Sequence, residues 1–236
     1  SKKQVDEKNK IQFLREADQI AELISERMRK YEDGLWGGVA GIQAKGGDIS
    51  LDDWGIFADS LQINFKYPGI NGIGVVHYIP PQKLNSYLEK QRKQRPDFHI
   101  HPKHNENEHF PITYIEPVNV NAKAIGLDMA HETNRYTAAK KARDTGLAQI
   151  TGPITLVQDE GKTPGFLFYA PFYKENAFGS LEERKKNLTG LVYAPFVVKK
   201  LMQGVLHKEK RQVGIQISDA GEILYDEHVD LNEDYD

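Results

Sequence analysis

The stretch that decides the fold of this chain is Phe166-Leu167-Phe168-Tyr169-Ala170-Pro171-Phe172-Tyr173. Its aromatic and apolar residues predict a β-strand, because such side chains fit the pleated, packed surface of a sheet. Alternation along the strand places Leu167, Tyr169 and Pro171 on one face and the remaining residues from Phe166 to Phe172 on the other. The pattern returns as Tyr193-Ala194-Pro195-Phe196, which two neighbouring strands with the same proline-ended pattern explain without an internal duplication.

Further strands and helices are predicted on both sides of this stretch. Strand-like runs occupy residues 73–79, 98–101, 112–116, 148–157 and 191–198, and the polar segment 158–164 reads as a hairpin loop. Helices are predicted over 80–95, over 131–144 up to the stop signal Gly146, and over 198–208. A last hairpin covers 213–218 and 222–225. This order predicts an α+β fold, with a PAS-like antiparallel sheet that carries helices on one side.

The N-terminal segment predicts one long amphipathic helix. Apolar or small residues alternate three and four positions apart, which is the spacing of a heptad seam. Two interpretations stay open: a helix that packs on its own domain, and a stalk that pairs with a second copy of the chain. The predicted dimer seam consists of Leu14, Ala17, Ala21, Ile24, Met28 and Tyr31, and the same spacing continues to Leu35.

Two further signals divide the chain. The glycine-rich run 34–41 indicates either close helix packing or a break, and Gly46-Gly47 marks the end of the helix. Ser50 with Asp53 is a capping-box variant that begins a second helix, which extends to Phe65. The expected units are a stalk helix at 1–48, a sensing unit at 49–198, and a connecting helix with a hairpin of a second, smaller unit at 199–236.

Composition excludes several classes of protein. The net charge of −3 and the pI near 6.3 argue against a nucleic-acid partner, which needs a basic surface. The absence of cysteine excludes disulfides, thiolate zinc sites and cysteine nucleophiles. No signal peptide and no apolar run long enough for a membrane span is present, so either the protein is soluble or its membrane segments lie outside this sequence.

The sequence holds no catalytic signature. Nucleophile-elbow, phosphate-loop, dinucleotide and calcium-loop motifs are all missing, so no catalytic residue and no cofactor is predicted. Four histidines, His99, His101, His104 and His109, lie close together, and such spacing is compatible with zinc. Because no metal-binding signature accompanies them, a polar, solvent-facing edge is the preferred interpretation and no metal is predicted.

An ordered set of motifs nevertheless resembles a known family. The runs 109–117, 124–128, 142–146, 150–154, 164–167 and 190–196 are similar, in order and spacing, to the core of CHASE domains. The resemblance covers about 69–206. It implies an extracytoplasmic sensor of a histidine kinase, a nucleotide cyclase or a diguanylate cyclase, at the periplasmic or extracellular face of the membrane. Membrane helices would flank this piece, the stalk would form a homodimer, and a two-component output would lie in other domains.

The resemblance also implies a pocket for a small-molecule ligand between the sheet and the segments that cover it. Carried over by position, the ligand-binding residues are Thr113, Tyr114, Ile115, Glu116, Leu127, Thr151 and one face of the strand 166–173. The Tyr169 hydroxyl favours the face with Leu167 and Tyr169, and the alternative that both faces are core stays open. One departure concerns the rim, where cytokinin receptors have an aspartate and this sequence reads Glu116-Pro117. The expected ligand is therefore a small, planar or amphipathic molecule of another kind. Asp128 is expected either to cap the next helix or to contact the ligand.

Two alternatives to this sensor remain at the level of sequence. A sensor that binds a partner protein would have its pocket filled by aromatic side chains. A soluble enzyme would show activity in the isolated chain or a histidine-bound metal.

Overall fold

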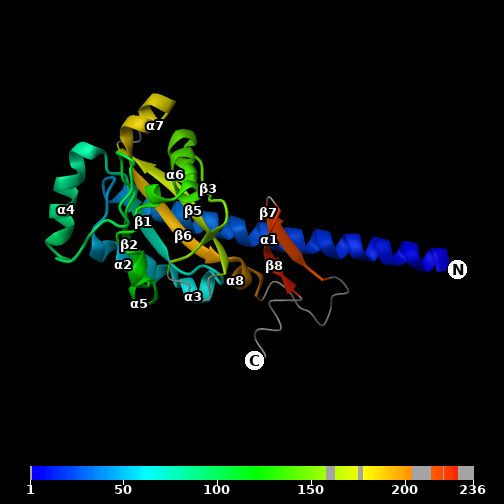
Figure 1. The fold of residues 1–236 in the computed structure, drawn as a ribbon. Coiled ribbons are helices and arrows are strands. Elements are labelled where there is room, and N and C mark those ends of the chain that lie inside the picture. Colours follow the sequence, from blue (N-terminus) through cyan, green and yellow to red (C-terminus); the bar gives the residue numbers. More distant parts are fainter. Residues whose placement is uncertain (1, 158–162, 175–177, 204–213, 220, 228–236) are drawn as a thin grey trace.

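The centre of the molecule is a six-stranded antiparallel sheet (Figure 1). The structure is a computed structural model that describes residues 2–157, 163–174, 178–203, 214–219 and 221–227. The strand order is β2-β1-β6-β5-β3, and β4 pairs with the other end of β5. The strands are β1 (Ile73–His77), β2 (Ile112–Glu116), β3 (Gln149–Ile150), β4 (Ile154–Thr155), β5 (Pro164–Tyr173) and β6 (Leu188–Val197).

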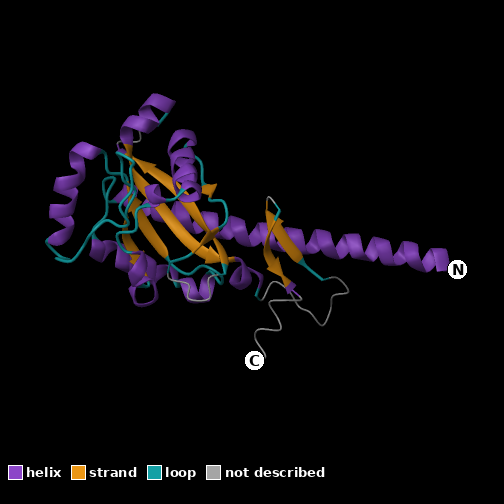
Figure 2. Cartoon of the chain, in the orientation of Figure 1, coloured by secondary structure: helices purple, strands orange, loops and turns teal. Residues whose placement is uncertain are grey.

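Helices cover both faces of this sheet (Figure 2). On one face lie α1 (Lys2–Ala44), α2 (Leu51–Leu61) and α3 (Ile63–Lys66). On the other face lie α6 (Thr133–Thr145) and the 3₁₀ helices η2 (Ala122–Ala124) and η3 (Met129–His131). Around the edges lie η1 (Pro81–Lys83), α4 (Leu84–Arg92), α5 (Val118–Asn121) and α7 (Leu181–Asn187). The α+β class is confirmed. The expectation that helices cover only one side of the sheet was wrong, because β5 and β6 are apolar on both faces and each face needs a cover.

The long N-terminal helix is continuous through its glycine-rich run. Gly38 lies where a Cβ atom would meet Val192 and Trp54 at 3.0 and 3.2 Å, so the run serves close packing of α1 on the sheet rather than a break. Tyr31 donates a hydrogen bond to the carbonyl of Pro68 and ties the helix to the loop before β1. As predicted, the helix ends before Gly46-Gly47 and Ser50 caps α2, accepting from the Asp53 amide. The second helix does not run on to Phe65 as predicted: α2 ends at Leu61, because the backbone turns into the left-handed region at Gln62 before α3 begins.

The predicted dimer seam divides between two environments. Ile24 packs on a small cluster at the C-terminal end of the chain, and Met28 and Tyr31 pack on the main core. Leu14, Ala17 and Ala21 are exposed on the part of α1 that projects beyond the sheet (Figure 1). Half of the seam is therefore occupied within the chain, and only its N-terminal half is free to meet another helix.

The C-terminal part forms a separate two-stranded hairpin beside α1 (Figure 1). After α8 (Val198–Met202), strands β7 (Gln216–Asp219) and β8 (Glu222–Asp226) pair in antiparallel register. Leu224 and Tyr225 of the hairpin pack with Val198 and Met202 of α8. The predicted extension of the helix to residue 208, most of the 158–164 loop and residue 220 of the turn lie outside the described residues.

Two predicted strands differ in the structure. The run 148–157 is not one strand but two short ones, because Gly152 and Pro153 interrupt the ladder and proline has no amide hydrogen to donate. The run 98–101 makes only an isolated bridge between His101 and Leu127. Its Phe98 packs against Tyr87 of α4 instead of lying in a sheet.

None of the helices among the described residues combines the length and the apolar character needed to cross a membrane.

Candidate functional site

The space between the sheet and α6 is the candidate ligand site. Its floor is the face of β5 and β6 that carries Tyr169 and Tyr193, which lie directly opposite each other. Its cover is the alanine face of α6 together with Met129 of η3 and Phe110. Small alanine side chains let the helix lie close to the large aromatic rings of the floor. The predicted faces of β5 are confirmed: Leu167 and Tyr169 belong to this cluster, while Phe168, Ala170 and Phe172 belong to the opposite one.

Four of the eight predicted ligand-binding residues meet in this space. Ile115 from β2, Leu127 from the segment before η3, and Leu167 and Tyr169 from β5 belong to the same buried cluster. They come from segments distant in sequence, which the sheet order β2-β1-β6-β5 brings under one cover.

A polar centre lies within this otherwise apolar space. The Tyr193 hydroxyl and the Arg135 Nε are fully buried, and neither has a hydrogen-bond partner among the residues that the structure describes. The Tyr169 hydroxyl reaches the Arg135 carbonyl at 3.4 Å. Burial raises the pKa of Tyr193 well above its ordinary value, so its hydroxyl is neutral at physiological pH. A buried donor without an acceptor lowers stability unless a ligand or water completes its hydrogen bond.

The other two nitrogens of the Arg135 guanidinium have partners that hold the group in place. Nη1 forms an ion pair with Glu132 at 3.2 Å, and Nη2 donates to the Thr155 carbonyl at 2.9 Å. The side chain is only 7% exposed, and Glu132 supplies a negative charge beside it. Because two of its nitrogens are fixed to the walls, the third, Nε, is held in place as well.

A glycine in the neighbouring strand makes room for Tyr193. Gly74 of β1 lies opposite Tyr193 in the antiparallel register. A Cβ atom at this position would collide with the Tyr193 ring and with the Tyr114 carbonyl. Only glycine therefore permits the tyrosine ring to lie against the backbone of β1.

The other predicted ligand-binding residues lie elsewhere. Thr151 is buried beside the site, but its hydroxyl accepts the Leu167 amide at 3.0 Å and so fixes the β3–β5 connection. Thr113 lies at a bulge between β1 and β2 and contacts His77 and Tyr87, each at 2.7 Å. Tyr114 packs in the cluster on the α1 side of the sheet. Glu116 lines a surface cleft at the sheet edge with Pro117 and α2.

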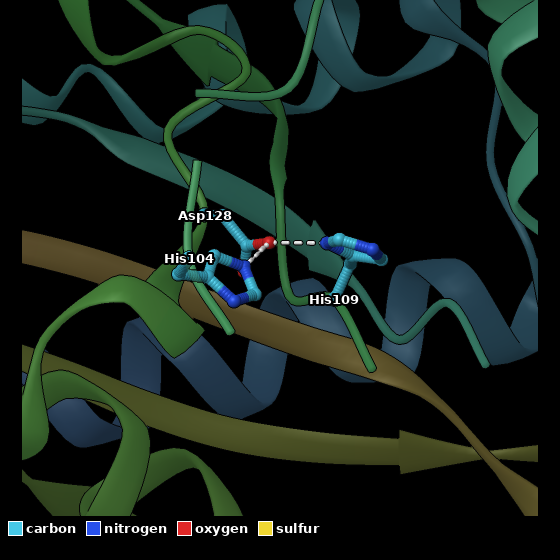
Figure 3. Close-up of side chains that lie close together, drawn as sticks. All are labelled: His104, His109 and Asp128. Atoms are coloured by element: carbon cyan, nitrogen blue, oxygen red, sulfur yellow. Dashed lines mark hydrogen bonds and ion pairs between the residues drawn. The ribbon is translucent and has the colours of Figure 1, made fainter. Parts of the chain in front are cut away.

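Asp128 is the centre of a second polar arrangement, at the rim of the cover (Figure 3). Its side chain is completely buried. One carboxylate oxygen accepts from His104 Nε2 and His109 Nδ1, both at 2.6 Å, and the other accepts the amides of Phe110 and Ala130 at 2.8 and 3.0 Å. The carboxylate thus joins three segments, and the expected helix cap at Asp128 is confirmed.

The hydrogen bonds also indicate what the two histidines do. His104 and His109 have side chains that are 8% and 20% exposed, so the expectation of a solvent-facing edge was wrong for them: the buried carboxylate draws both rings inward. The Glu106 amide donates to His104 Nδ1 at 3.1 Å, so the ring proton of the neutral imidazole lies on Nε2. The three side chains are close enough to surround a metal ion. In this tautomer, however, Nε2 donates to Asp128 and has no lone pair for a metal.

Sequence reasoning missed two residues of the site, Tyr193 and Arg135. Tyr193 had a usable signal, because it is the equivalent of Tyr169 in the repeated Tyr-Ala-Pro-Phe pattern. Arg135 had none: an arginine in a polar helix is typical of an exposed surface, and only the packing of α6 on the sheet buries it.

Comparison with known proteins agrees with the sequence resemblance. The family model described as the CHASE domain matches residues 47–227, which is most of the chain. No curated protein matches the sequence.

Proposed function

This chain belongs to the CHASE domain family, an extracytoplasmic sensor module of signalling receptors, and we propose that it binds a small molecule between its sheet and α6. In this proposal the receptor is of the histidine-kinase or cyclase type. The catalytic step belongs to output domains outside this chain, and the sensor lies at the periplasmic or extracellular face of a membrane to which flanking segments anchor it.

One observation carries the ligand site: two buried hydrogen-bond donors, the Tyr193 hydroxyl and Arg135 Nε, have no partner among the described residues. The surrounding side chains are apolar, with Ile115, Leu127 and Leu167 in the same cluster. A matching ligand has an apolar, planar body and a hydrogen-bond acceptor that reaches the two donors. The site would thus combine apolar burial with a small number of fixed polar groups, which is the usual composition of small-molecule sites.

The arrangement suggests how binding would be transmitted. Strands β5 and β6 form the floor of the proposed site and, with their opposite faces, contact α1. A ligand that enters between the sheet and α6 must move the cover or the floor, because Phe110, Tyr169 and Tyr193 are packed there. Movement of the floor would shift α1, which runs on beyond the sheet (Figure 1). In this proposal the ligand acts by favouring one of two arrangements of α1 and the sheet.

We also propose that α1 forms a homodimer through its projecting half. Leu14, Ala17 and Ala21 form the exposed part of the heptad seam, and Val5 and Ile11 are exposed nearby. An apolar surface on a helix without a covering element is expected to associate with another apolar surface. In a homodimer the same residues of the second copy would supply it.

The test of ligand binding is a thermal-shift screen of the chain with small planar and amphipathic metabolites, followed by calorimetry of any hit. The Tyr193→Phe variant should bind the hit about tenfold or more weakly, because it lacks a hydrogen-bond donor. Tyr67→Phe, on the other side of the sheet, is the matched control and should bind as the parent chain does. A hit whose affinity is the same in the parent and in Tyr193→Phe would overturn the proposed site.

A specific observation also favours the second function, a sensor that binds a partner protein. Phe110, Met129, Tyr169 and Tyr193 fill the space between the sheet and α6, and all are nearly or fully inaccessible to solvent. A space filled in this way is what the protein-binding alternative requires. It is favoured if the screen yields no hit while the receptor still responds to a purified protein.

A further inference from the structure

A cleft at one end of the sheet carries an excess of positive charge. It has a volume of about 180 Å³ and lies between the α4 region and the strands β1 and β6. Its inner surface includes the buried side chains of His77, Tyr87 and Leu188. Four lysines from separate segments line it: Lys83 of η1, Lys90 of α4, Lys174 after β5 and Lys186 of α7.

Among the residues that the structure describes, one acid lines this cleft, and it is already engaged. Asp48 accepts from His77 Nε2 at 2.9 Å and pairs with Lys90 at 3.5 Å. Burial acts to raise the pKa of Asp48, but the hydrogen bond and charge of His77, with Lys90, lower it to about 2, so the carboxylate is ionised at neutral pH. One lysine is therefore neutralised, and three remain.

The three remaining lysines have no acidic partner within the described residues. Lys83 and Lys174 line the same cleft, and the nearby side chain of Lys174 and its charge lower the pKa of Lys83. Two ammonium groups repel each other when nothing lies between them. Like charges held at one position are a typical feature of a site for an anion, which removes the repulsion when it binds.

An independent observation lies at the back of the same cleft. The Thr189 hydroxyl is buried and has no hydrogen-bond partner among the described residues. Thr189 is the second residue of β6, and its carbonyl accepts the Tyr78 amide at 2.9 Å, so its backbone position is fixed. A hydroxyl can donate to an anionic oxygen, and such charge-assisted hydrogen bonds are stronger than neutral ones.

We propose that this cleft binds a small dianion, with its charged groups at Lys83, Lys174 and Lys186 and one oxygen at the Thr189 hydroxyl. A cleft of about 180 Å³ is small, which suits a short dicarboxylate or inorganic phosphate. Lysine acts as a compact point charge, so it recognises carboxylate and phosphate oxygens alike.

This site is distinct from the one proposed between the sheet and α6. The residues that line the cleft do not include Tyr169, Tyr193 or Arg135 of the other site. Binding here can therefore be measured whether or not the other site takes a ligand.

The test uses the whole chain, with succinate and inorganic phosphate as probes in separate calorimetric titrations at low ionic strength. The parent chain should bind at least one of the two. The double variant Lys83→Gln/Lys174→Gln should bind it about tenfold or more weakly, since each lost charged contact weakens binding severalfold or more. The matched control is Lys140→Gln/Lys141→Gln, which removes the same charge from α6, and it should bind as the parent does.

Two further results define the outcome. Thr189→Val should weaken binding and leave the circular dichroism spectrum unchanged, which separates loss of the hydroxyl from loss of the fold. Binding of succinate but not phosphate identifies a dicarboxylate site, and the reverse identifies a phosphate site. The proposal is overturned if neither anion binds at 10 mM, a concentration above the dissociation constant of even a weak specific site, about millimolar. It is also overturned if the Lys83/Lys174 double variant binds as well as the parent chain.

Discussion

Tyr169 and Tyr193 lie directly opposite each other on β5 and β6, but among the described residues only the Tyr169 hydroxyl has a hydrogen-bond acceptor. Both rings are completely buried on the face of the sheet that α6 covers. The two residues occupy equivalent positions in the repeated Tyr-Ala-Pro-Phe pattern, yet their polar ends meet different surroundings. This difference allows their hydroxyl groups to be compared within one site.

The Tyr193→Phe variant should be as stable as the parent chain or more stable, by up to about 1 kcal/mol, because it removes a buried donor that lacks a partner. Tyr169→Phe should lower the free energy of unfolding by up to about 1 kcal/mol, because it removes the hydrogen bond from the Tyr169 hydroxyl to the Arg135 carbonyl. Urea unfolding of both variants measures the two values. A Tyr193→Phe variant much less stable than Tyr169→Phe would mean that the Tyr193 hydroxyl is satisfied in solution.

Replacing the buried carboxylate at the rim of the cover should lower stability strongly. Asp128→Asn keeps the shape but removes the charge and turns one accepting oxygen into a donor facing N–H groups. The expected loss is about 2–4 kcal/mol. Asp144→Asn is the matched control, because Asp144 pairs with Arg143 at a half-exposed position and should contribute less than about 1 kcal/mol. Equal losses in the two variants, measured by urea unfolding, would contradict the structural role of Asp128.

The Asp48–His77 pair predicts a pH dependence at the acidic end. The folded-state pKa of Asp48, about 2, lies below its ordinary value of 3.8. A carboxyl group with a lowered pKa contributes stability above its ordinary pKa, and the contribution is lost as the pH falls through the folded-state value. The difference in unfolding free energy between the parent and Asp48→Asn should thus shrink as the pH falls from 3.8 toward about 2. Denaturant unfolding across this range measures it, and a difference that grows on acidification would refute the assignment.

The two halves of the predicted seam on α1 should respond differently to a charge. Leu14→Glu lies on the exposed half and should reduce self-association in sedimentation experiments, with unfolding free energy changed by less than about 0.5 kcal/mol. Ile24→Glu should instead lower stability by about 1–3 kcal/mol, because Ile24 packs on the cluster formed by α8 and the β7–β8 hairpin. Self-association that survives Leu14→Glu would exclude the projecting half as the dimer surface.

Much of the fold follows from local patterns in the sequence. The long helix, the Ser50 cap, β2, the two strands with the repeated pattern and the stop of α6 at Gly146 all lie close to where the sequence predicts them. These features depend on neighbouring residues alone: periodicity, capping and the absence of a side chain at a left-handed position. The run 148–157 also contains its local signal: Gly152-Pro153 indicates the interruption that the structure shows. The apolar residues around this pair favoured the wrong prediction of one continuous strand.

The sequence by itself determined the α+β class, the family and the alternation of β5, because each rests on the order and spacing of residues along the chain. Only the tertiary structure decided which residues share the space under α6. The buried guanidinium of Arg135, the Tyr193 hydroxyl that has no partner in the described part of the chain, and the inward turn of His104 toward Asp128 all depend on contacts between segments distant in sequence. The cost of burying a charge or a donor is set by those contacts, and no local pattern encodes them.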